Sequence, residues 1–267
     1  MTNSPEQLLI HAISAALKAS VEILNIYNSP FAVEMKEDKS PLTAADKASH
    51  AIITSELSEL GVPVLSEEGQ FDSFNIRGAW NKFWLVDPLD GTKEFIKRNG
   101  EFTINIALLE NNQPVMGVIH VPVWDVLYAG YGNSLFRIEK ASQQSIRSIA
   151  DLNNFLIKPS VSSDSESLVR VLASRSHMSP ETQNFVRDLE KKYSKVELLS
   201  AGSALKFCLL AEGKADVYPR FAPTMEWDTA AGHALLKTVG KNILLVHSGL
   251  EMPYNKHSLV NDWFIAK

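Results

Sequence analysis

The N-terminal part of the chain has the periodicity of helices. Ser4, Pro5 and Gln7 form the pattern of a helix start, with a capping serine, a proline at the first helical position and a glutamine that closes a capping box. Apolar residues follow at helical spacing as far as Leu24, and a second helix is predicted over residues 44–60. Because the polar face of the first helix is not strongly basic, we expect it to pack on a core rather than lie on a membrane.

The middle third alternates between apolar and polar residues with the period of β-strands. Strands are predicted at residues 83–86, 102–108, 115–120, 124–131 and 135–138. Turn signals at 111–114 and 132–134 separate them, which indicates a β-meander in one antiparallel sheet with helices on it.

Beyond residue 160 strands and helices alternate. Strands are predicted at residues 169–173, 196–199, 215–218 and 243–246, and helices at residues 180–193, 205–212 and 229–239. The polar, Ser-rich stretch 141–167 is interpreted as a connection. The fold class is therefore α/β, with an α+β subdomain over residues 1–160 and an α/β subdomain over residues 161–267.

Composition and charge narrow the class of protein. The 267 residues are 45% hydrophobic and 21% charged, which is ordinary for a globular protein. The formal net charge is −5 and Lys and Arg form no dense cluster, which argues against a nucleic-acid polymer as partner. Cys208 is the only cysteine, so an intrachain disulfide is excluded and a reducing, cytoplasmic compartment is expected. The first residues lack a basic region and a long apolar run, so we expect neither a signal peptide nor a transmembrane segment.

The most informative segment is an apolar strand that ends in two carboxylates, Asp87 and Asp90. Pro88 removes an amide donor between them, and Gly91 permits the positive φ of a tight turn. With the carbonyl oxygen of Leu89 the two carboxylates can converge on one cation, and such oxygen ligands favour Mg²⁺ over zinc. Taken alone, the segment also fits an acidic turn that only stops a strand.

Other chemistry-bearing residues stand at the ends of predicted elements. Thr92 is expected to cap a short helix whose free amides suit a phosphate. Glu67 follows a short strand, Asp228 is predicted as the N-cap of a helix, and Asp46 lies near another helix start. Capping and helix-dipole roles explain each residue separately. However, acidic side chains stand at the ends of four predicted elements of one chain, which indicates a shared site.

These segments resemble a known family. Residues 87–92 together with residues 227–232 are similar to the two-part signature of the inositol monophosphatase-like, lithium-sensitive metal phosphatases, and residues 40–46 and 65–68 match the family's remaining blocks in the same order. The resemblance covers almost the whole chain and implies a layered αβαβα sandwich. Three segments resemble the bacterial 3′(2′),5′-bisphosphate nucleotidases in particular: residues 87–103, 205–208 and 218–221.

The resemblance implies a set of metal ligands. Glu67, Asp87 and the Leu89 carbonyl would hold one Mg²⁺. Asp87, Asp90 and Asp228 would hold a second, with Asp87 bridging, and a third, weaker ion would lie near Glu67. Two such metals can activate a water and stabilise the oxygen that leaves in an in-line displacement.

The resemblance also implies catalytic and substrate-binding residues. Asp46 and Thr92 resemble the pair that orients and deprotonates the attacking water. The residues that would contact the substrate are Glu67, Leu89, Asp90, Gly91, Thr92, Ser174, His177, Ser203, Lys206, Arg220 and Asp228. Among them, Ser174 and His177 resemble the turn that contacts the 5′-phosphate. Without the resemblance, Lys206 and Arg220 would be interpreted as solvated surface charges.

The implied activity is Mg²⁺-dependent removal of the 3′-phosphate from adenosine 3′,5′-bisphosphate, giving AMP and phosphate. The sulfated form of this nucleotide would be a second substrate, with a role in sulfur assimilation, sensitivity to lithium and a peripheral place on the cytoplasmic face of the inner membrane. An inositol monophosphatase is an alternative that shares every metal ligand but has no use for Lys206 or Arg220. A catalytically inactive nucleotide sensor is another, against which the intact Asp46 and Thr92 argue. The sequence specifies no oligomeric state.

Overall fold

The computed structural model describes residues 3–36, 41–70, 72–159, 167–173 and 178–267. Its α-helices are α1 (Pro5–Tyr27), α2 (Ala44–Ser58), α3 (Phe74–Arg77), α4 (Thr92–Ile96), α5 (Ile149–Leu152), α6 (Pro180–Glu190), α7 (Leu205–Ala211) and α8 (Glu226–Thr238). Its strands up to β8 are β1 (Val33–Met35), β2 (Pro41–Thr43), β3 (Val64–Ser66), β4 (Lys82–Asp90), β5 (Thr103–Glu110), β6 (Gln113–Val121), β7 (Val126–Tyr131) and β8 (Ser134–Glu139). The remaining strands are β9 (Leu156–Ile157), β10 (Leu168–Leu172), β11 (Lys195–Leu199), β12 (Tyr218–Arg220), β13 (Thr224–Met225), β14 (Ile243–Leu245), β15 (Val260–Asn261) and β16 (Phe264–Ala266).

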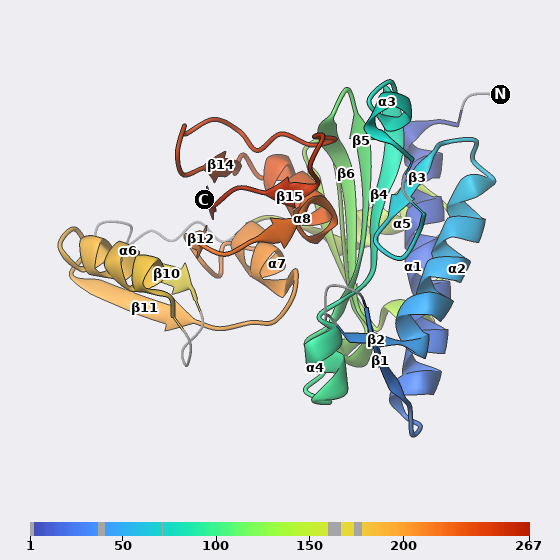
Figure 1. Cartoon of the computed structure of the whole chain (residues 1–267), viewed down its shortest axis with the longest axis horizontal. Helices are drawn as coiled ribbons and strands as arrows, with labels where there is room; N and C mark the ends of the chain where they lie inside the picture. Colours follow the sequence, from blue (N-terminus) through green and yellow to red (C-terminus); the bar gives the residue numbers. More distant parts are fainter. Residues whose placement is uncertain (1–2, 37–40, 71, 160–166, 174–177) are drawn as a thin grey trace.

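A seven-stranded sheet in the order β3-β4-β5-β6-β7-β8-β9 forms the centre of the molecule. β3 is parallel to β4, and all other neighbouring strands in this sheet are antiparallel. α1 and α2 lie side by side on one face of the sheet, and α8 covers the other face (Figure 1). The predicted β-meander is thus confirmed, with β3 added in parallel at one edge.

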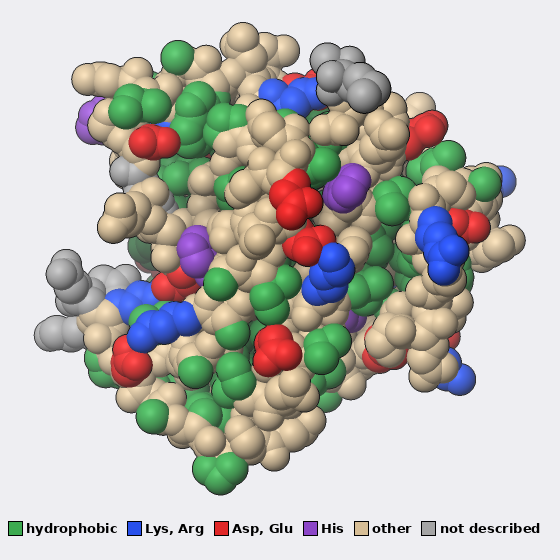
Figure 2. All heavy atoms as spheres, turned by 90° about the vertical axis from the view of Figure 1, so that its right-hand side faces the viewer, with side chains coloured by type: hydrophobic (Ala, Val, Ile, Leu, Met, Phe, Trp, Pro, Cys, Tyr) green, Lys and Arg blue, Asp and Glu red, His purple; other side chains and the backbone are tan. Residues whose placement is uncertain are grey.

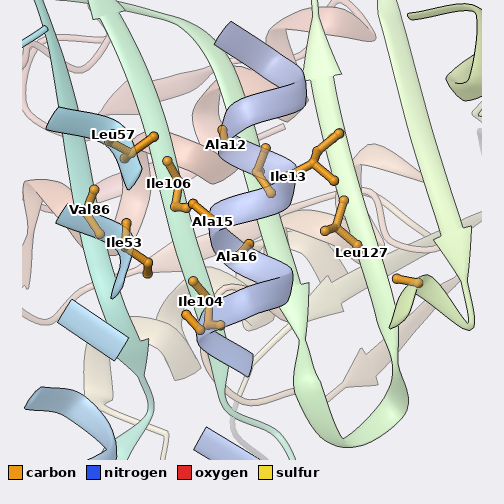
Figure 3. Close-up of a cluster of buried hydrophobic side chains, with 14 of the residues drawn as sticks. Ala12, Ile13, Ala15, Ala16, Ile53, Leu57, Val86, Ile104, Ile106 and Leu127 are labelled. Carbon is orange, nitrogen blue, oxygen red and sulfur yellow. The ribbon is translucent and has the colours of Figure 1, made fainter. Parts of the chain in front are cut away.

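The main hydrophobic core lies between the sheet and the α1–α2 pair (Figure 3). Ala12, Ala15 and Ala16 of α1 are fully buried, as are Ile104 and Ile106 of β5, and the small alanine side chains allow the helix to approach the strand closely. By length and composition α1 is the one helix in the described part of the chain that could cross a membrane. Its buried apolar face instead packs on the sheet, as the periodicity predicts.

α8 packs on the opposite face of the sheet at very short range. A Cβ atom added to Gly117 of β6 would lie 2.3 Å from the carbonyl oxygen of Ala231, so only glycine permits this approach. α8 also contacts β4 and β5, the strands that carry the acidic turn. The close packing therefore fixes the first turn of α8 relative to that turn.

Smaller sheets lie beyond α8. β10 and β11 pair in parallel, and β12, β16 and β14 form an antiparallel three-stranded sheet. A bridge between Val171 and Val217 joins the two, and α6 packs against β11 and β12 from outside. The successive layers are thus helices, sheet, helices, sheets and helix, which confirms the expected layered α/β fold (Figure 1).

Two predictions about strands are wrong. β4 does not stop before Asp87 but continues to Asp90, because a local bulge carries the strand past Pro88 and pairing with β5 resumes. The Ser-rich stretch is not only a connection, because residues 156–157 form β9, which pairs antiparallel with β8 and makes the sheet's last strand. Residues 160–166 of that stretch lie outside the described residues.

Helix starts are partly as predicted. Ser4 and Gln7 form the expected capping box of α1. Asp228 is not the N-cap of α8, since the helix begins at Glu226 and Asp228 occupies its third position. Thr92 is the first residue of α4 rather than its cap, which is Gly91 at φ +92°. Both helices begin one to three residues earlier than the patterns suggest.

The face formed by α1, α2 and α3 bears charged side chains of both signs. Among its described residues, acidic and basic groups appear as separate spots between apolar side chains rather than as one basic field (Figure 2). This distribution resembles an ordinary solvated surface.

Candidate active site

The acidic turn is a β-bulge in β4. Asp87 pairs with Asn105 and Asp90 with Thr103, so two residues of β4 stand opposite a single residue of β5. The Asp87 carboxylate accepts a hydrogen bond from the Leu89 amide at 3.1 Å. The bulge therefore breaks the alternation of the strand and allows both aspartates to serve one site.

α2 begins directly beside this bulge. One oxygen of Asp46 accepts hydrogen bonds from the Thr43 backbone N–H at 2.8 Å and from its hydroxyl at 2.6 Å. The other oxygen accepts a hydrogen bond from the Thr92 hydroxyl at 3.1 Å. Ser49, almost one turn further along α2, donates to the carbonyl oxygen of Pro88 at 2.7 Å. The structure thus brings the predicted catalytic pair together and holds α2 against the bulge.

Glu67 and Glu68 follow β3, the neighbour of β4, and both are paired with Lys36. The Lys36 ammonium lies 2.8 Å from Glu67 and also contacts Glu68. Burial lowers the pKa of Lys36, but its hydrogen bonds to the two carboxylates outweigh burial and raise the pKa above its usual value. Lys36 was not predicted, because no motif or spacing distinguishes it from other lysines in the sequence.

Asp228 reaches the site from the first turn of α8. Its carboxylate accepts a hydrogen bond from the Met225 backbone N–H at 2.8 Å, which satisfies one free donor of the helix start. Among the described residues, only the Met225 amide donates to the Asp228 carboxylate. Asp228 thus combines a helix-capping contact with membership of the acidic group.

The carboxylates of these elements raise one another's pKa. Burial raises the pKa of Asp87 well above its usual value, and the charges of Glu67, Asp90 and Asp228 raise it further. Burial raises the pKa of Asp90 to about 6, although the positive charge of Lys206 opposes the shift. Burial and the charge of Asp90 together raise the pKa of Asp228 to about 8. The positive charges around these buried carboxylates are therefore too few to balance their negative charge.

A divalent cation fits this charge distribution. Carboxylate oxygens are the ligands that Mg²⁺ prefers, and a cation would relieve the repulsion that raises the pKa values. Across the described residues, no three His, Cys, Asp or Glu side chains are grouped closely enough to form a metal site by themselves. The electrostatics therefore support a cation, whereas the complete ligand set stays a prediction.

A pocket of about 460 Å³ opens beside the acidic turn. Asp90, Gly91 and Asp228 contribute to its lining, and so do Lys206 and Arg220. A volume of this size is typical of pockets for small organic ligands. The pocket therefore places carboxylates and two cationic side chains around one ligand.

The two cations differ in how they are held. Lys206 donates a hydrogen bond to the carbonyl oxygen of Ser203 at 3.0 Å and lies 5.5 Å from the centroid of the Tyr218 ring. Arg220 makes one long contact, 3.5 Å, to the carbonyl oxygen of Pro223. Its buried Nε has no hydrogen-bond partner among the described residues, so a ligand acceptor would remove the cost of that unpaired donor.

Two contacts join the loop before α7 to the acidic turn and to the segment that precedes β5. The Ser203 hydroxyl donates to the Asp90 carbonyl oxygen at 2.8 Å, and the Glu101 carboxylate accepts from the Gly202 backbone N–H at 2.8 Å. A Cβ at Gly91 would lie 2.1 Å from the Ser203 hydroxyl oxygen, so this approach requires glycine. Ser203 was expected to contact the nucleotide, but its hydroxyl donates its proton to the acidic turn. Glu101 belongs to a segment that carries the family resemblance, but residue type alone did not suggest its contact.

Most predicted site residues gather at the turn or in the pocket. Those the structure places there are Asp46, Glu67, Asp87, Leu89, Asp90, Gly91, Thr92, Ser203, Lys206, Arg220 and Asp228. Ser174 and His177 lie outside the described residues. Lys36, Ser49 and Glu101 also contact this region but were not predicted from the sequence.

This fold, with an acidic bulge beside a mixed-charge pocket, corresponds to a known class of protein. The model of the inositol monophosphatase family matches residues 4–263, and the chain belongs to that family. It is 41% identical to the 3′(2′),5′-bisphosphate nucleotidase CysQ of Escherichia coli (strain K12) over 240 residues, which cover 88% of this chain and 89% of that protein.

Two further relatives extend the similarity over nearly the full length. The 3′(2′),5′-bisphosphate nucleotidase CysQ of Haemophilus influenzae is 34% identical over 264 residues, covering 97% of this chain and 92% of that protein. The crystal structure of CysQ from Bacteroides thetaiotaomicron has a TM-score of 0.88 at 46% identity, covering 98% of this chain and 97% of that one. These matches confirm the family that the four motifs indicate.

Proposed function

We propose that the protein is a Mg²⁺-dependent 3′(2′),5′-bisphosphate nucleotidase that converts adenosine 3′,5′-bisphosphate to AMP and phosphate. The observation that carries this proposal is one pocket lined by Asp90 and Asp228 and also by Lys206 and Arg220. Carboxylates with a cation suit the phosphate that reacts, and the two basic side chains suit a second phosphate that does not. The similarity to the CysQ nucleotidases supports the same substrate class.

The chain's own residues provide a route for the proton of the attacking water. The Thr92 hydroxyl has one proton, which it donates to Asp46, so its oxygen is left to accept a hydrogen bond from water. As water attacks phosphorus, its proton passes to Thr92 while the Thr92 proton passes to Asp46. Burial raises the pKa of Asp46 despite the opposing hydrogen bonds from Thr43, which makes its carboxylate a better base.

The residues that would hold Mg²⁺ are Glu67, Asp87, Asp90 and Asp228 with the Leu89 carbonyl. When bound, Mg²⁺ supplies Lewis-acid activation of water and positive charge for the leaving oxygen. Lys36 pairs with Glu67 in the structure, so its ammonium offsets part of the negative charge of these ligands in the protein alone. The rest of the protein contribution is positioning of the phosphate by the bulge and by the first turn of α8.

We propose that the division near residue 160 separates two tasks. Residues 1–160 supply Asp46, Asp87 and Asp90 to the chemistry, and residues 161–267 supply Lys206 and Arg220 to recognition of the nucleotide. Asp228 is an exception, because it lies in the second part of the chain but contributes to the chemistry. The 5′-phosphate would bind in the second part, to which the resemblance also assigns the contacts of Ser174 and His177.

The sulfated nucleotide is proposed as a second substrate, because Lys206 and Arg220 in the pocket lining can pair with a phosphate or with a phosphosulfate anion. That chemistry would place the enzyme in sulfur assimilation. An inositol monophosphatase would need the same carboxylates but would leave the unpaired Nε of Arg220 without a ligand. A nucleotide sensor would need the pocket but not the hydrogen bond between Asp46 and Thr92.

The test is phosphate release with Mg²⁺ from adenosine 3′,5′-bisphosphate, its 5′-sulfated form, inositol 1-phosphate and fructose 1,6-bisphosphate. We expect kcat/KM for the adenosine substrates to exceed the other two by at least about tenfold, since one charge-assisted contact alone is worth roughly that ratio. A preference for inositol 1-phosphate would favour the first alternative. Tight nucleotide binding without release of phosphate would favour the sensor.

A further inference from the structure

Four aromatic side chains contribute to the lining of the pocket, and three of them belong to the hydrophobic core. These three are Phe207, Tyr218 and Phe264, each at most 6% exposed. Their rings contact one another at centroid distances of 5.3 to 6.2 Å, and Lys206 lies over the Tyr218 ring. Their surfaces are therefore already used in packing.

Phe221 is the fourth aromatic residue and differs from the others. It directly follows Arg220 at the end of β12, it lines the pocket, and it is partly exposed rather than buried. Its ring belongs to a separate aromatic group with Phe185 of α6 and Trp263, which precedes β16. Trp263 is 43% exposed, so this group lies at the surface rather than in the core.

The geometry of this group holds the Phe221 ring without stacking on it. The ring centroids of Phe185 and Phe221 are 5.9 Å apart with planes inclined at 61°, and those of Phe221 and Trp263 are 5.8 Å apart at 78°. Both pairs are edge-to-face contacts, which fix ring orientation. Neither neighbour stacks flat on Phe221, so neither covers a face of its ring, and the residue is partly exposed where it lines the pocket.

The remaining features of the pocket separate charge from apolar surface. The cationic residues Lys206 and Arg220 line the same pocket as the carboxylates Asp90 and Asp228. Phosphates would therefore occupy the part of the pocket between these charges. A nucleobase carries no charge and needs an apolar, aromatic surface, which Phe221 provides in the pocket lining together with Met178 and Ala222.

We propose that Phe221, held in place by Phe185 and Trp263, is the surface on which the aromatic base of the substrate stacks. The proposal rests on the proposed nucleotidase function and adds the residue that recognises the base. It makes the protein selective for phosphates attached to a planar aromatic group over phosphates of plain sugars or cyclitols. Stacking of one base on one aromatic side chain accounts for about a 5- to 150-fold difference in binding.

The experiment compares two ligands that differ only in the base. Dissociation constants for AMP and for D-ribose 5-phosphate are measured by calorimetry, with Mg²⁺, in the full-length wild type and in Phe221→Ala, Phe221→Leu and Phe221→Trp. We expect Phe221→Ala to weaken AMP binding about 5- to 150-fold and ribose 5-phosphate binding less than twofold. Phe221→Trp retains a flat ring and should keep AMP binding within about threefold, whereas Phe221→Leu, which is apolar but not flat, should lose most of it.

Phe74→Ala is the matched control, because Phe74 is also a partly exposed phenylalanine, 38% exposed, but lies on α3 away from the pocket lining. This variant should bind both ligands as the wild type does. Equal weakening of AMP and ribose 5-phosphate in Phe221→Ala would overturn the proposal, because the residue would then support the pocket rather than the base. Unchanged AMP binding in Phe221→Ala and Phe221→Leu would overturn it as well.

The outcome is independent of whether the proposed reaction occurs. Turnover of adenosine 3′,5′-bisphosphate by the wild type is measured separately, and its absence would refute the nucleotidase function. A preference for AMP over ribose 5-phosphate that Phe221→Ala abolishes would still establish the base site in that case. Should Phe221→Ala not fold, the contrast between the Leu and Trp variants gives the same decision.

Discussion

The two ends of the pocket are built from different kinds of structure. The acidic end draws on β4 with nine residues, α2 with fifteen and α8 with thirteen, all packed on the seven-stranded sheet. The recognition end draws on β12 with three residues, α7 with seven and the loop before it. Long elements with buried faces hold side chains more precisely than short strands and loops do. The difference fits the tasks, since chemistry needs exact placement of charge while recognition can use several weaker contacts.

Two hydrogen bonds join polar groups of the two ends. Ser203 donates to the Asp90 carbonyl oxygen, and Glu101 accepts from the Gly202 amide. α7 also packs on α8 in a shared hydrophobic core, so the two ends belong to one body while their polar groups stay distinct. We therefore expect changes at the acidic end to affect every substrate alike, and changes at the recognition end to depend on the substrate.

The largest effect is expected from Asp90→Asn. The substitution keeps the shape of the side chain and removes one negative charge from the acidic end, so it should reduce kcat at saturating Mg²⁺ by roughly 100- to 1,000-fold, as for the loss of one electrostatic group at a reacting centre. The loss should be equal for adenosine 3′,5′-bisphosphate and adenosine 3′-monophosphate. Steady-state kinetics measure it, and circular dichroism confirms the fold. Near-normal turnover would show that Asp90 does not serve the chemistry.

The recognition end should show smaller and selective effects. A charge-assisted contact to a phosphate that does not react is worth about 1.5–3 kcal/mol, so Lys206→Ala or Arg220→Ala should lower kcat/KM for adenosine 3′,5′-bisphosphate about 10- to 150-fold, mainly through KM. Hydrolysis of adenosine 3′-monophosphate, which lacks the 5′-phosphate, should be nearly unaffected by the residue that makes this contact. Lys93→Ala, an exposed lysine of α4, serves as the control. Equal losses on both substrates would assign the residue to the acidic end instead.

Thermal stability should distinguish the acidic end by its response to pH. The pKa values of Asp90 and Asp228, about 6 and about 8, exceed their ordinary value, so between pH 4 and 8 the folded state binds more protons than the unfolded state. The free energy of unfolding without metal should therefore fall as pH rises through this range. Mg²⁺ binds the ionised carboxylates, so it should raise Tm more at pH 8 than at pH 5.

The expected size of this effect follows from mass action. At about 100 times its dissociation constant a ligand adds about 2.7 kcal/mol, which corresponds to a rise in Tm of roughly 5–10 °C at this chain length. Differential scanning fluorimetry with Mg²⁺ or a chelator at both pH values measures it. In Asp90→Asn the Mg²⁺ effect at pH 8 should shrink, while in Lys93→Ala it should persist. If Mg²⁺ raised Tm equally at the two pH values, the cation would not bind these carboxylates.

The acidic end was largely predictable from sequence because its residues stand in short local motifs. Asp87 and Asp90 are three positions apart, and the approach of Ser203 to Gly91 explains why that position is glycine. The start of α8 was predicted less well. Asp228 accepts from the Met225 amide at the third helical position, which looks the same in sequence as a cap because an aspartate suits both places.

The contacts that were missed all join residues far apart in the chain. Lys36 meets Glu67 across 31 residues, and Glu101 meets Gly202 across 101 residues. The aromatic group around Phe221 likewise assembles from α6, β12 and the segment before β16. Periodicity and motifs report on neighbours in sequence, so only the fold can reveal such pairs. Because β9 has only two residues, its apolar segment carries no period, and its pairing with β8 was hidden in the same way.

The smallest effect is expected from Li⁺. The ion resembles Mg²⁺ in size but has half its charge, so it should compete for the cation position near the leaving oxygen without supplying the same stabilisation. Half-inhibition is expected on the order of 1 mM, typical of a weak ion site, and it should move to higher Li⁺ as Mg²⁺ is raised. Initial rates at two Mg²⁺ concentrations test this, with NaCl at equal ionic strength as the control for screening. Because Li⁺ acts at the acidic end, it should inhibit hydrolysis of adenosine 3′,5′-bisphosphate and of adenosine 3′-monophosphate to the same degree. Inhibition confined to the first substrate would mean that the ion binds with the 5′-phosphate, and the separation of the two ends would then not hold.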